Sequence, residues 1–222
     1  MGSPNVIWEQ GTVLTQESAQ NHFDLLRADQ EVRLHELQHA LSTQYATGSS
    51  DEIASAVGLE YSAQFERAVR DRETGLSVAR YTARLVFGEA PSTDDQRIGL
   101  MAATIATYPA AGAAASTEET VARALIQRAG DGGWLGADEY ELDPSGDLIA
   151  VRGLWDAFRN CLGSSCGGTC LGALGSCLPL GALPAVVACL AATCGLCAAK
   201  CAACVACDCG WLCSVVTGCC HT

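Results

Sequence analysis

Residues 161–197 read CLGSSCGGTCLGALGSCLPLGALPAVVACLAATCGLC, and no side chain between Arg159 and Lys200 carries a charge. All 14 cysteines lie in the last 62 residues of this 222-residue chain, whereas 24 of its 25 acidic residues come earlier. The chain therefore consists of two chemically different parts. We expect an acidic domain over residues 1–153 and a Cys-rich apolar domain over residues 154–222.

The uncharged run is long enough to span a bilayer, but its sequence indicates a helical hairpin instead. Pro179, Gly181 and Pro184 interrupt the run and divide it into two segments that both carry cysteines. We therefore expect two short helices joined by a turn around Gly181.

The cysteine spacing predicts two rows that face each other. Cys166, Cys170 and Cys177 are four and seven positions apart, and those from Cys194 to Cys204 are three or four apart, so each row shares one helix face. Antiparallel helices lined by Ala and Gly allow the Cα distances of about 4.4–6.8 Å that disulfides need. Full oxidation of all 14 cysteines gives seven disulfides, whose pairing the spacing leaves open. The candidate disulfide residues are Cys161, Cys166, Cys170, Cys177, Cys189, Cys194, Cys197, Cys201, Cys204, Cys207, Cys209, Cys213, Cys219 and Cys220.

Cysteine density of this kind is typical of small domains in an oxidising compartment. We therefore expect the tail to be secreted, although the first ten residues, MGSPNVIWEQ, show no basic segment and no apolar signal core. A rigid hairpin rich in Leu, Val and Ala leaves apolar surface exposed, which favours binding at membranes. The expected partner of the tail is a target-cell membrane or a receptor in it. A stapled Cys-rich domain without such activity is the alternative.

The tail also resembles a known group. Residues 161–197, followed by KCAACVACDCGWLC over residues 200–213, resemble the halocin C8-like bacteriocins. These are apolar, Cys-rich antimicrobial peptides carried at the C-terminus of a longer precursor. The resemblance implies that the tail is released as the active peptide, and that the part upstream acts as a leader, an immunity segment or a chaperone.

Soft-metal binding is another interpretation of the same cysteines. C-x-x-C and C-x-x-x-C spacings between residues 194 and 207 suit Zn²⁺ or Cu(I), because thiolates are preferred ligands of both ions. The tail holds a single lysine to balance the charge of such thiolates, which disfavours this interpretation.

The acidic part is predicted to be mainly helical, which gives a mainly α protein: a helical N-terminal domain followed by a small disulfide-rich α-helical hairpin. Apolar residues recur at helical spacing over residues 24–43, through much of 51–87, and over 117–129. The Ala-rich segment 98–115 is predicted to be a buried core helix. Short strands are expected over residues 5–14 and 147–151, and another helix over WDAFRN, residues 155–160.

Within the first predicted helix, His35, Glu36 and His39 form an H-E-x-x-H motif in the stretch LHELQHAL. His35 and His39 share one helix face and can present two imidazoles to one Zn²⁺. Glu36 is the candidate catalytic base that takes a proton from metal-bound water. Zinc would be the cofactor and a peptide the substrate. An exposed helix with His and Glu on its polar face is the alternative.

The block LHELQHAL resembles the active-site helix of zincin-type metallopeptidases. The segment SDEIASAVGLEYS, residues 50–62, resembles the stretch C-terminal to that helix in some members, which makes Glu52 the first candidate for the third zinc ligand and Glu60 the second. Asp51 and Glu66 are further carboxylates nearby.

The charge of the chain excludes one class of partner. Proteins that bind nucleic acid use clusters of Lys and Arg to neutralise phosphates. This chain has a net charge of −12 and no run of Lys or Arg, so nucleic acid is not expected as a partner. Three hypotheses remain. The first is the precursor of a membrane-active antimicrobial peptide, the alternative is a zinc metallopeptidase, and the second alternative is a Cys-rich tail that binds Cu(I) or Zn²⁺.

Overall fold

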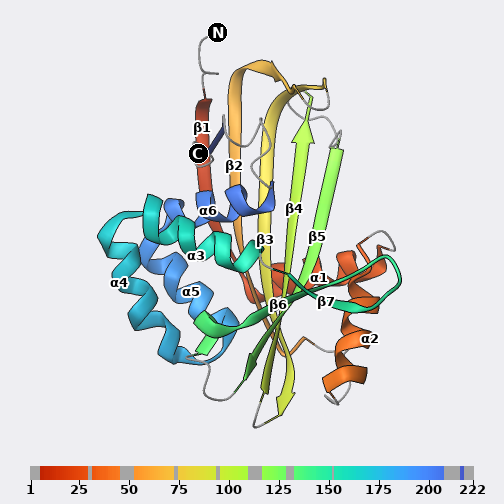
Figure 1. Cartoon of the computed structure of the whole chain (residues 1–222). Helices are drawn as coiled ribbons and strands as arrows, with labels where there is room; N and C mark the ends of the chain where they lie inside the picture. Colours follow the sequence, from red (N-terminus) through yellow and green to blue (C-terminus); the bar gives the residue numbers. More distant parts are fainter. Residues whose placement is uncertain are drawn as a thin grey trace.

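The structure, a computed structural model, centres on one antiparallel sheet (Figure 1). It describes residues 6–29, 32–45, 53–72, 75–93, 96–109, 117–128, 133–151, 153–207 and 216–217. Seven strands lie in chain order, so each strand pairs with its neighbours in sequence. They are β1 (Val6–Leu14), β2 (Ser55–Arg70), β3 (Ser77–Thr93), β4 (Gln96–Tyr108), β5 (Thr117–Arg128), β6 (Asp138–Leu142) and β7 (Leu148–Val151).

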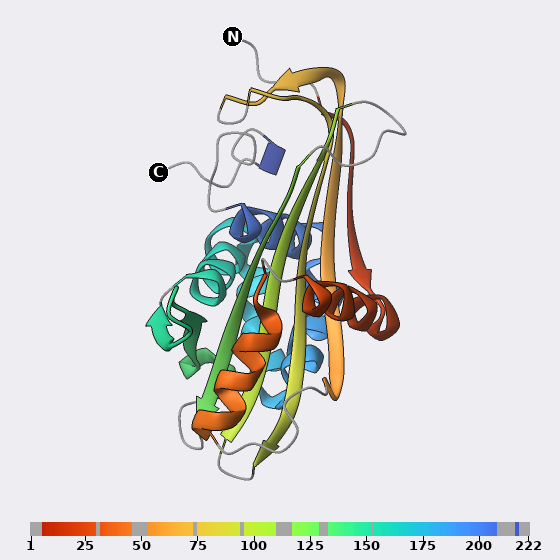
Figure 2. The same ribbon diagram turned by 90° about the vertical axis from the view of Figure 1, so that its right-hand side faces the viewer.

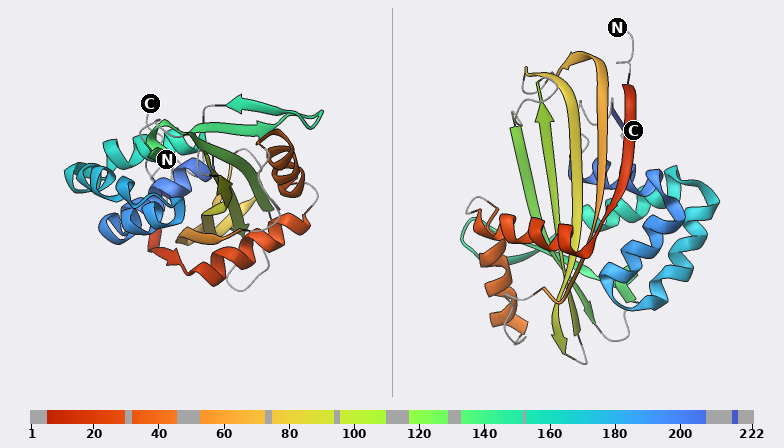
Figure 3. Two further views of the ribbon diagram at one scale, coloured as in Figure 1. Left: turned by 90° about the horizontal axis from the view of Figure 1, so that it is seen from below. Right: turned by 180° about the vertical axis from the view of Figure 1, so that it is seen from behind.

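Helices cover both faces of this sheet (Figures 1 and 3). Helices α1 (Gln16–Ala28) and α2 (Leu34–Tyr45) lie on one face, the side that Figure 2 turns toward the viewer. A 3₁₀ turn, η1 (Gly133–Gly136), joins β5 to β6. The opposite face carries α3 (Leu154–Ser165), α4 (Gly167–Cys177), η2 (Leu178–Leu180), α5 (Leu183–Cys194) and α6 (Leu196–Ala206).

The expectation of a mainly α protein with a helical N-terminal domain is therefore wrong. Strands β2 and β3 occupy most of the predicted helix 51–87, β4 occupies the described part of the predicted core helix 98–115, and β5 replaces the predicted helix 117–129. The short strands expected near both ends of the acidic part are confirmed as β1 and β7, and WDAFRN lies in α3. The first predicted helix forms as two helices, α1 and α2, separated by Arg33 with a positive φ of 53°.

Burial on both faces explains why these strands resemble helices in sequence. Strands covered on both sides lose the alternation of polar and apolar residues that marks a half-exposed strand. Odd-numbered residues of the central strands form one core with α3–α6, and we call this side the odd face: Val57, Leu59, Leu85, Phe87, Met101, Ala103 and Leu125. Even-numbered residues, the even face, form a second core with α1 and α2: Val86, Ala90, Ile98, Leu100, Ala102, Ala124 and Ile126.

Below α1, the even face also holds a polar contact. His22 is 8% exposed, and its Nε2 lies 3.1 Å from the Thr104 Oγ1 of β4. Burial lowers the pKa of His22 to about 4, and the nearby Arg84 guanidinium adds to this, against the opposing effect of Glu60. His22 is therefore neutral in the folded protein near neutral pH.

We predict that acid weakens the fold through His22. Between the ordinary pKa of 6.5 and the folded value of about 4, the unfolded chain binds a proton that the folded chain does not, so stability falls as pH falls. His22→Gln, which cannot titrate, should lose about 3 kcal/mol less than the wild type when the pH drops from 7 to 4. Urea unfolding at both pH values measures this difference, and equal losses in both proteins would refute the assignment.

Candidate functional site

Residues 154–207, here called the Cys-rich helical unit, are held by a ladder of four nested disulfides. The pairs join the descending segment α3–α4 to the returning segment α5–α6 with Cα distances of 5.5–5.7 Å: Cys161–Cys201, Cys166–Cys197, Cys170–Cys194 and Cys177–Cys189. The predicted hairpin and its facing cysteine rows are confirmed. Cys204 and Cys207 are also disulfide-bonded, while Cys209, Cys213, Cys219 and Cys220 lie outside the described residues.

The unit packs its apolar side on the odd face of the sheet. Phe87 of β3 meets Trp155 and Phe158 of α3, with ring centroids 6.0 and 5.8 Å apart. Val187 and Leu190 of α5 are fully buried in the same core. The hairpin therefore has no apolar face of its own open to water at this side, because the sheet covers it.

Two sheet glycines allow the helices to approach closely. A Cβ added to Gly11 of β1 would lie 2.7 Å from the Ala199 Cβ and 3.0 Å from the Leu196 Cα of α6. A Cβ added to Gly99 of β4 would lie 2.5 Å from Leu183 at the start of α5. Real Cβ atoms do not approach other atoms as closely as 2.7 Å, so Gly11 fits against α6 only as glycine, whereas a Cβ at Gly99 would require the Leu183 side chain to move.

Three glutamates of the odd face hold three of the helices. Glu139 of β6 accepts hydrogen bonds from the backbone amides of Leu154 and Trp155, at 3.0 and 3.1 Å, and so caps the N-terminus of α3. Burial raises the pKa of Glu139, and these two amides oppose the rise. Glu89 of β3, whose pKa is also raised by burial, accepts a hydrogen bond from the backbone of Leu183 at the start of α5.

The third glutamate binds the only lysine of the chain. Lys200 of α6 lies 2.8 Å from Glu9 Oε2 of β1, and Tyr61 donates a hydrogen bond to the same oxygen. The hydrogen bond from Lys200 lowers the pKa of Glu9, so this carboxylate stays ionised and keeps its partner. Burial together with Glu9 raises the pKa of Tyr61, which therefore remains a donor.

Trp134 of η1 forms hydrogen bonds with two parts of the Cys-rich helical unit, the hairpin turn and the start of α3. Its indole Nε1 donates to the carbonyl oxygen of Gly181 in the hairpin turn at 2.6 Å, and its own carbonyl accepts from the Trp155 Nε1 at 2.7 Å. Trp134 is fully buried. Both ends of the Cys-rich helical unit, the turn and the start of α3, are therefore fixed by one residue.

The linker between sheet and unit borders a cleft. The cleft has a volume of about 620 Å³ and is lined by Val151 at the end of β7, by Gly153 and by Leu154 at the start of α3, together with residues of α3, α6, β5 and β6. Val151, Gly153 and Leu154 are partly exposed. The chain is thus accessible where the sheet ends and the unit begins.

The H-E-x-x-H motif lies across the sheet from this interface, on the solvent side of α2. His35, Glu36 and His39 are exposed, while Leu37 and Leu41 face the even-face core. The described residues bring no group of three His, Cys, Asp or Glu ligand atoms together around these histidines.

The candidate third ligands do not complete a zinc site within the described chain. Glu52, like Asp51, lies outside the described residues. Glu60 of β2 forms an ion pair with Arg84 of β3, with 2.5 Å between Oε2 and Nε. Zinc binding at the histidine pair stays a prediction.

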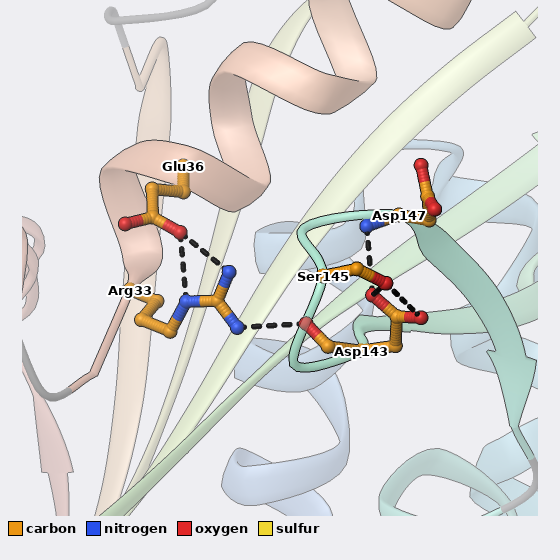
Figure 4. Close-up of polar contacts among 5 residues, drawn as sticks. All are labelled: Arg33, Glu36, Asp143, Ser145 and Asp147. Atoms are coloured by element: carbon orange, nitrogen blue, oxygen red, sulfur yellow. Dashed lines mark hydrogen bonds and ion pairs between the residues drawn. The ribbon is translucent and has the colours of Figure 1, made fainter.

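The structure gives Glu36 a partner of a different kind. Arg33 contacts Glu36 Oε2 through two nitrogens, at 2.6 and 2.7 Å, and donates from Nη1 to the carbonyl oxygen of Asp143 in the β6–β7 turn (Figure 4). Ser145 donates to the Asp143 carboxylate, which lowers the pKa of Asp143. Glu36 thus helps to tie the start of α2 to this turn.

One cysteine group has ligand-like geometry. The sulfur atoms of Cys166, Cys197 and Cys201 lie within 4.8 Å of one another, so the three residues could hold a metal ion. In the oxidised chain these sulfurs are engaged in disulfides.

Comparison with family models, with curated proteins and with solved structures gives no match to this chain. Among the described helices, none has both the length and the apolar character needed to cross a membrane. The multiple disulfides are compatible with an extracellular location. The geometry of the interface is therefore the basis for a functional assignment.

We predict that Gly11→Ala weakens docking of α6, because the new methyl group meets Ala199 and the backbone of Leu196, neither of which can rotate away. The free energy of unfolding should fall by about 1–3 kcal/mol. Gly172→Ala is the matched control, since a Cβ there meets nothing within 4 Å and Ala favours the helix. Chemical denaturation of both variants checks the prediction, which fails if Gly11→Ala is as stable as the control.

Glu139→Ala should loosen the start of α3. The change leaves the amides of Leu154 and Trp155 without their carboxylate, at a cost of about 1–3 kcal/mol. Arg123 forms ion pairs with both Glu139 and Glu141. Glu141→Ala is the control, because the Glu141 side chain is more exposed than that of Glu139, and its loss should cost less than about 1 kcal/mol. Hydrogen exchange of the first turn of α3 should accelerate in Glu139→Ala alone. Unchanged protection there would contradict the capping role.

Proposed function

We propose that this chain is the precursor of a secreted, disulfide-stapled antimicrobial peptide that acts on a target-cell membrane or a receptor in it. The Cys-rich helical unit is the active peptide. The sheet and its even-face helices keep the apolar side of the unit covered until the linker is cut. The observation that carries the proposal is the burial of this side against the odd face of the sheet.

Release from the sheet uncovers an apolar surface on the Cys-rich helical unit. Helix α5 carries no charged residue and buries six of its 12 residues in the docked state. A released unit exposes Val186, Val187, Leu190 and the aromatic pair of α3 on one rigid surface. Apolar surface of this kind partitions to membrane interfaces.

The covalent arrangement favours release. Every cysteine lies after residue 160, so no disulfide can join the unit to the sheet. The two parts are connected through the backbone near residues 151–154 alone, where the chain borders the cleft. One cut in this linker therefore leaves two pieces that only non-covalent contacts hold together.

The disulfides themselves support an extracellular role. Four rungs fix the helices of a unit that has too few residues to build a stable core alone. The resemblance of roughly residues 155–222 to halocin C8-like bacteriocins is consistent with this role.

The proposal is tested by cutting the folded chain. A recognition site for a specific protease is inserted after Val151, and leakage of dye from phosphatidylcholine and phosphatidylglycerol vesicles is measured before and after cleavage. The uncut protein should not cause leakage. The oxidised unit, separated from the sheet by size exclusion, should cause leakage and inhibit susceptible cells. Reduction and alkylation should abolish both effects, because the apolar surface is no longer held rigid.

Lys200 gives an independent readout of release. It is the only lysine, and its side chain is 31% exposed while it pairs with Glu9, so amine labelling of this site should become faster after release. A scrambled insertion that the protease does not cut is the control. Release seen by Lys200 labelling, with neither leakage nor growth inhibition by the oxidised unit, would disprove the antimicrobial function.

A further inference from the structure

The two disulfides nearest the end of β7 place three sulfurs within 4.8 Å of one another, with the fourth, that of Cys161, bonded to one of them. Cys161–Cys201 and Cys166–Cys197 are separate disulfides, yet the Cys166 and Cys201 sulfurs are only 3.6 Å apart. In a tetrahedral zinc site with Zn–S bonds of about 2.3 Å, neighbouring sulfurs are about 3.8 Å apart. The spacing across the two rungs is therefore close to the spacing of zinc ligands.

We propose that, in the reduced chain, Cys166, Cys197 and Cys201 bind one Zn²⁺ between α3 and α6, with Cys161 as the fourth thiolate. The three named sulfurs already lie within 4.8 Å of one another. The fourth, that of Cys161, is bonded to the Cys201 sulfur in the oxidised chain, so it lies at the edge of the same group. Four thiolates around one ion form a common structural zinc site.

The positions of these cysteines do not depend on the disulfides alone. Phe158 and Leu162 of α3 and Ala198 and Ala202 of α6 are fully buried in the odd-face core. These contacts hold the two helices side by side when the sulfurs are reduced. The Cα atoms of the two pairs, at 5.6 and 5.7 Å, then stay close enough for rotation of the side chains to bring the sulfurs around an ion.

The local environment favours thiolates and admits the ion. Cys197 lies in the first turn of α6, where the positive end of the helix dipole stabilises a negative charge. Cys201 is fully buried, whereas Cys166 and Cys197 are partly exposed and give access from solvent. Among the described residues, the two disulfides nearest the hairpin turn, Cys170–Cys194 and Cys177–Cys189, contribute no sulfur to such a group.

Oxidation expels the ion. Two molecules of a low-molecular-weight disulfide accept four electrons from the zinc tetrathiolate and take up four protons, which yields four small thiols. The four cysteine sulfurs form the bonds Cys161–Cys201 and Cys166–Cys197, and Zn²⁺ leaves. The site thus holds α3 and α6 in register in a reducing compartment and gives way to the disulfides in an oxidising one.

The test uses the full chain, reduced under anaerobic conditions, with Zn²⁺ as the probe. After desalting, elemental analysis gives the number of bound ions, and alkylation followed by peptide mapping shows which cysteines the metal protects. We expect Zn²⁺ to protect Cys161, Cys166, Cys197 and Cys201 in the wild type, and oxidised glutathione to release that ion. No bound zinc, or protection confined to other cysteines, would overturn the proposal.

Paired variants locate the ion independently. The double variant Cys166→Ser with Cys201→Ser should bind one ion fewer per chain than the wild type. The double variant Cys177→Ser with Cys189→Ser removes the disulfide beside the hairpin turn and should bind as many ions as the wild type. If both variants lose the same number of zinc ions, or if the variant lacking Cys177 and Cys189 alone loses one, the metal is bound elsewhere. The alkylation map of the wild type decides the question if a variant fails to fold.

Discussion

The contact of Phe87 with Trp155 and Phe158 joins the sheet to the Cys-rich helical unit, and the other features of the molecule are arranged around it. Because the odd face is covered by this unit and the even face by α1 and α2, the central strand β4 is buried at every position from Ile98 to Thr104. Close packing also favours glycine at Gly11 of the edge strand β1, where the backbone of α6 approaches the strand. The polar anchors Glu9, Glu89 and Glu139 also point to the odd face, each toward one helix.

Local patterns predicted the unit well and the sheet poorly. Pro179, Gly181 and the cysteine rows are signals over a few residues, and the hairpin they predict is present. The strands were not predicted because burial on both faces removes the alternation of polar and apolar residues. In β4, Ala102 and Ala103 are both buried, one against each helical layer. Ala-rich segments have high helix propensity, and pairing with neighbouring strands overrides it here.

The interface could not be predicted from the sequence because its members are distant in the chain. Glu139 caps a helix that begins 15 residues later, and Glu9 meets Lys200 across 191 residues. The H-E-x-x-H motif shows the opposite case, a local signal around which the described residues gather no group of three metal-ligand atoms. Its spacing is what any amphipathic helix with Leu37 and Leu41 on the core side and polar residues on the other side would show.

The nested order of the ladder also sets an order in time. Cys177 and Cys189 enclose the shortest loop, 12 residues in sequence, and the following rungs span 24, 31 and 40. Once the rung beside the turn has closed, each later rung adds only a short loop, so its entropic cost is small. Oxidative folding can therefore proceed from the turn outward. The sheet packs against both segments in one core, and this packing favours the register in which the native cysteine pairs face each other.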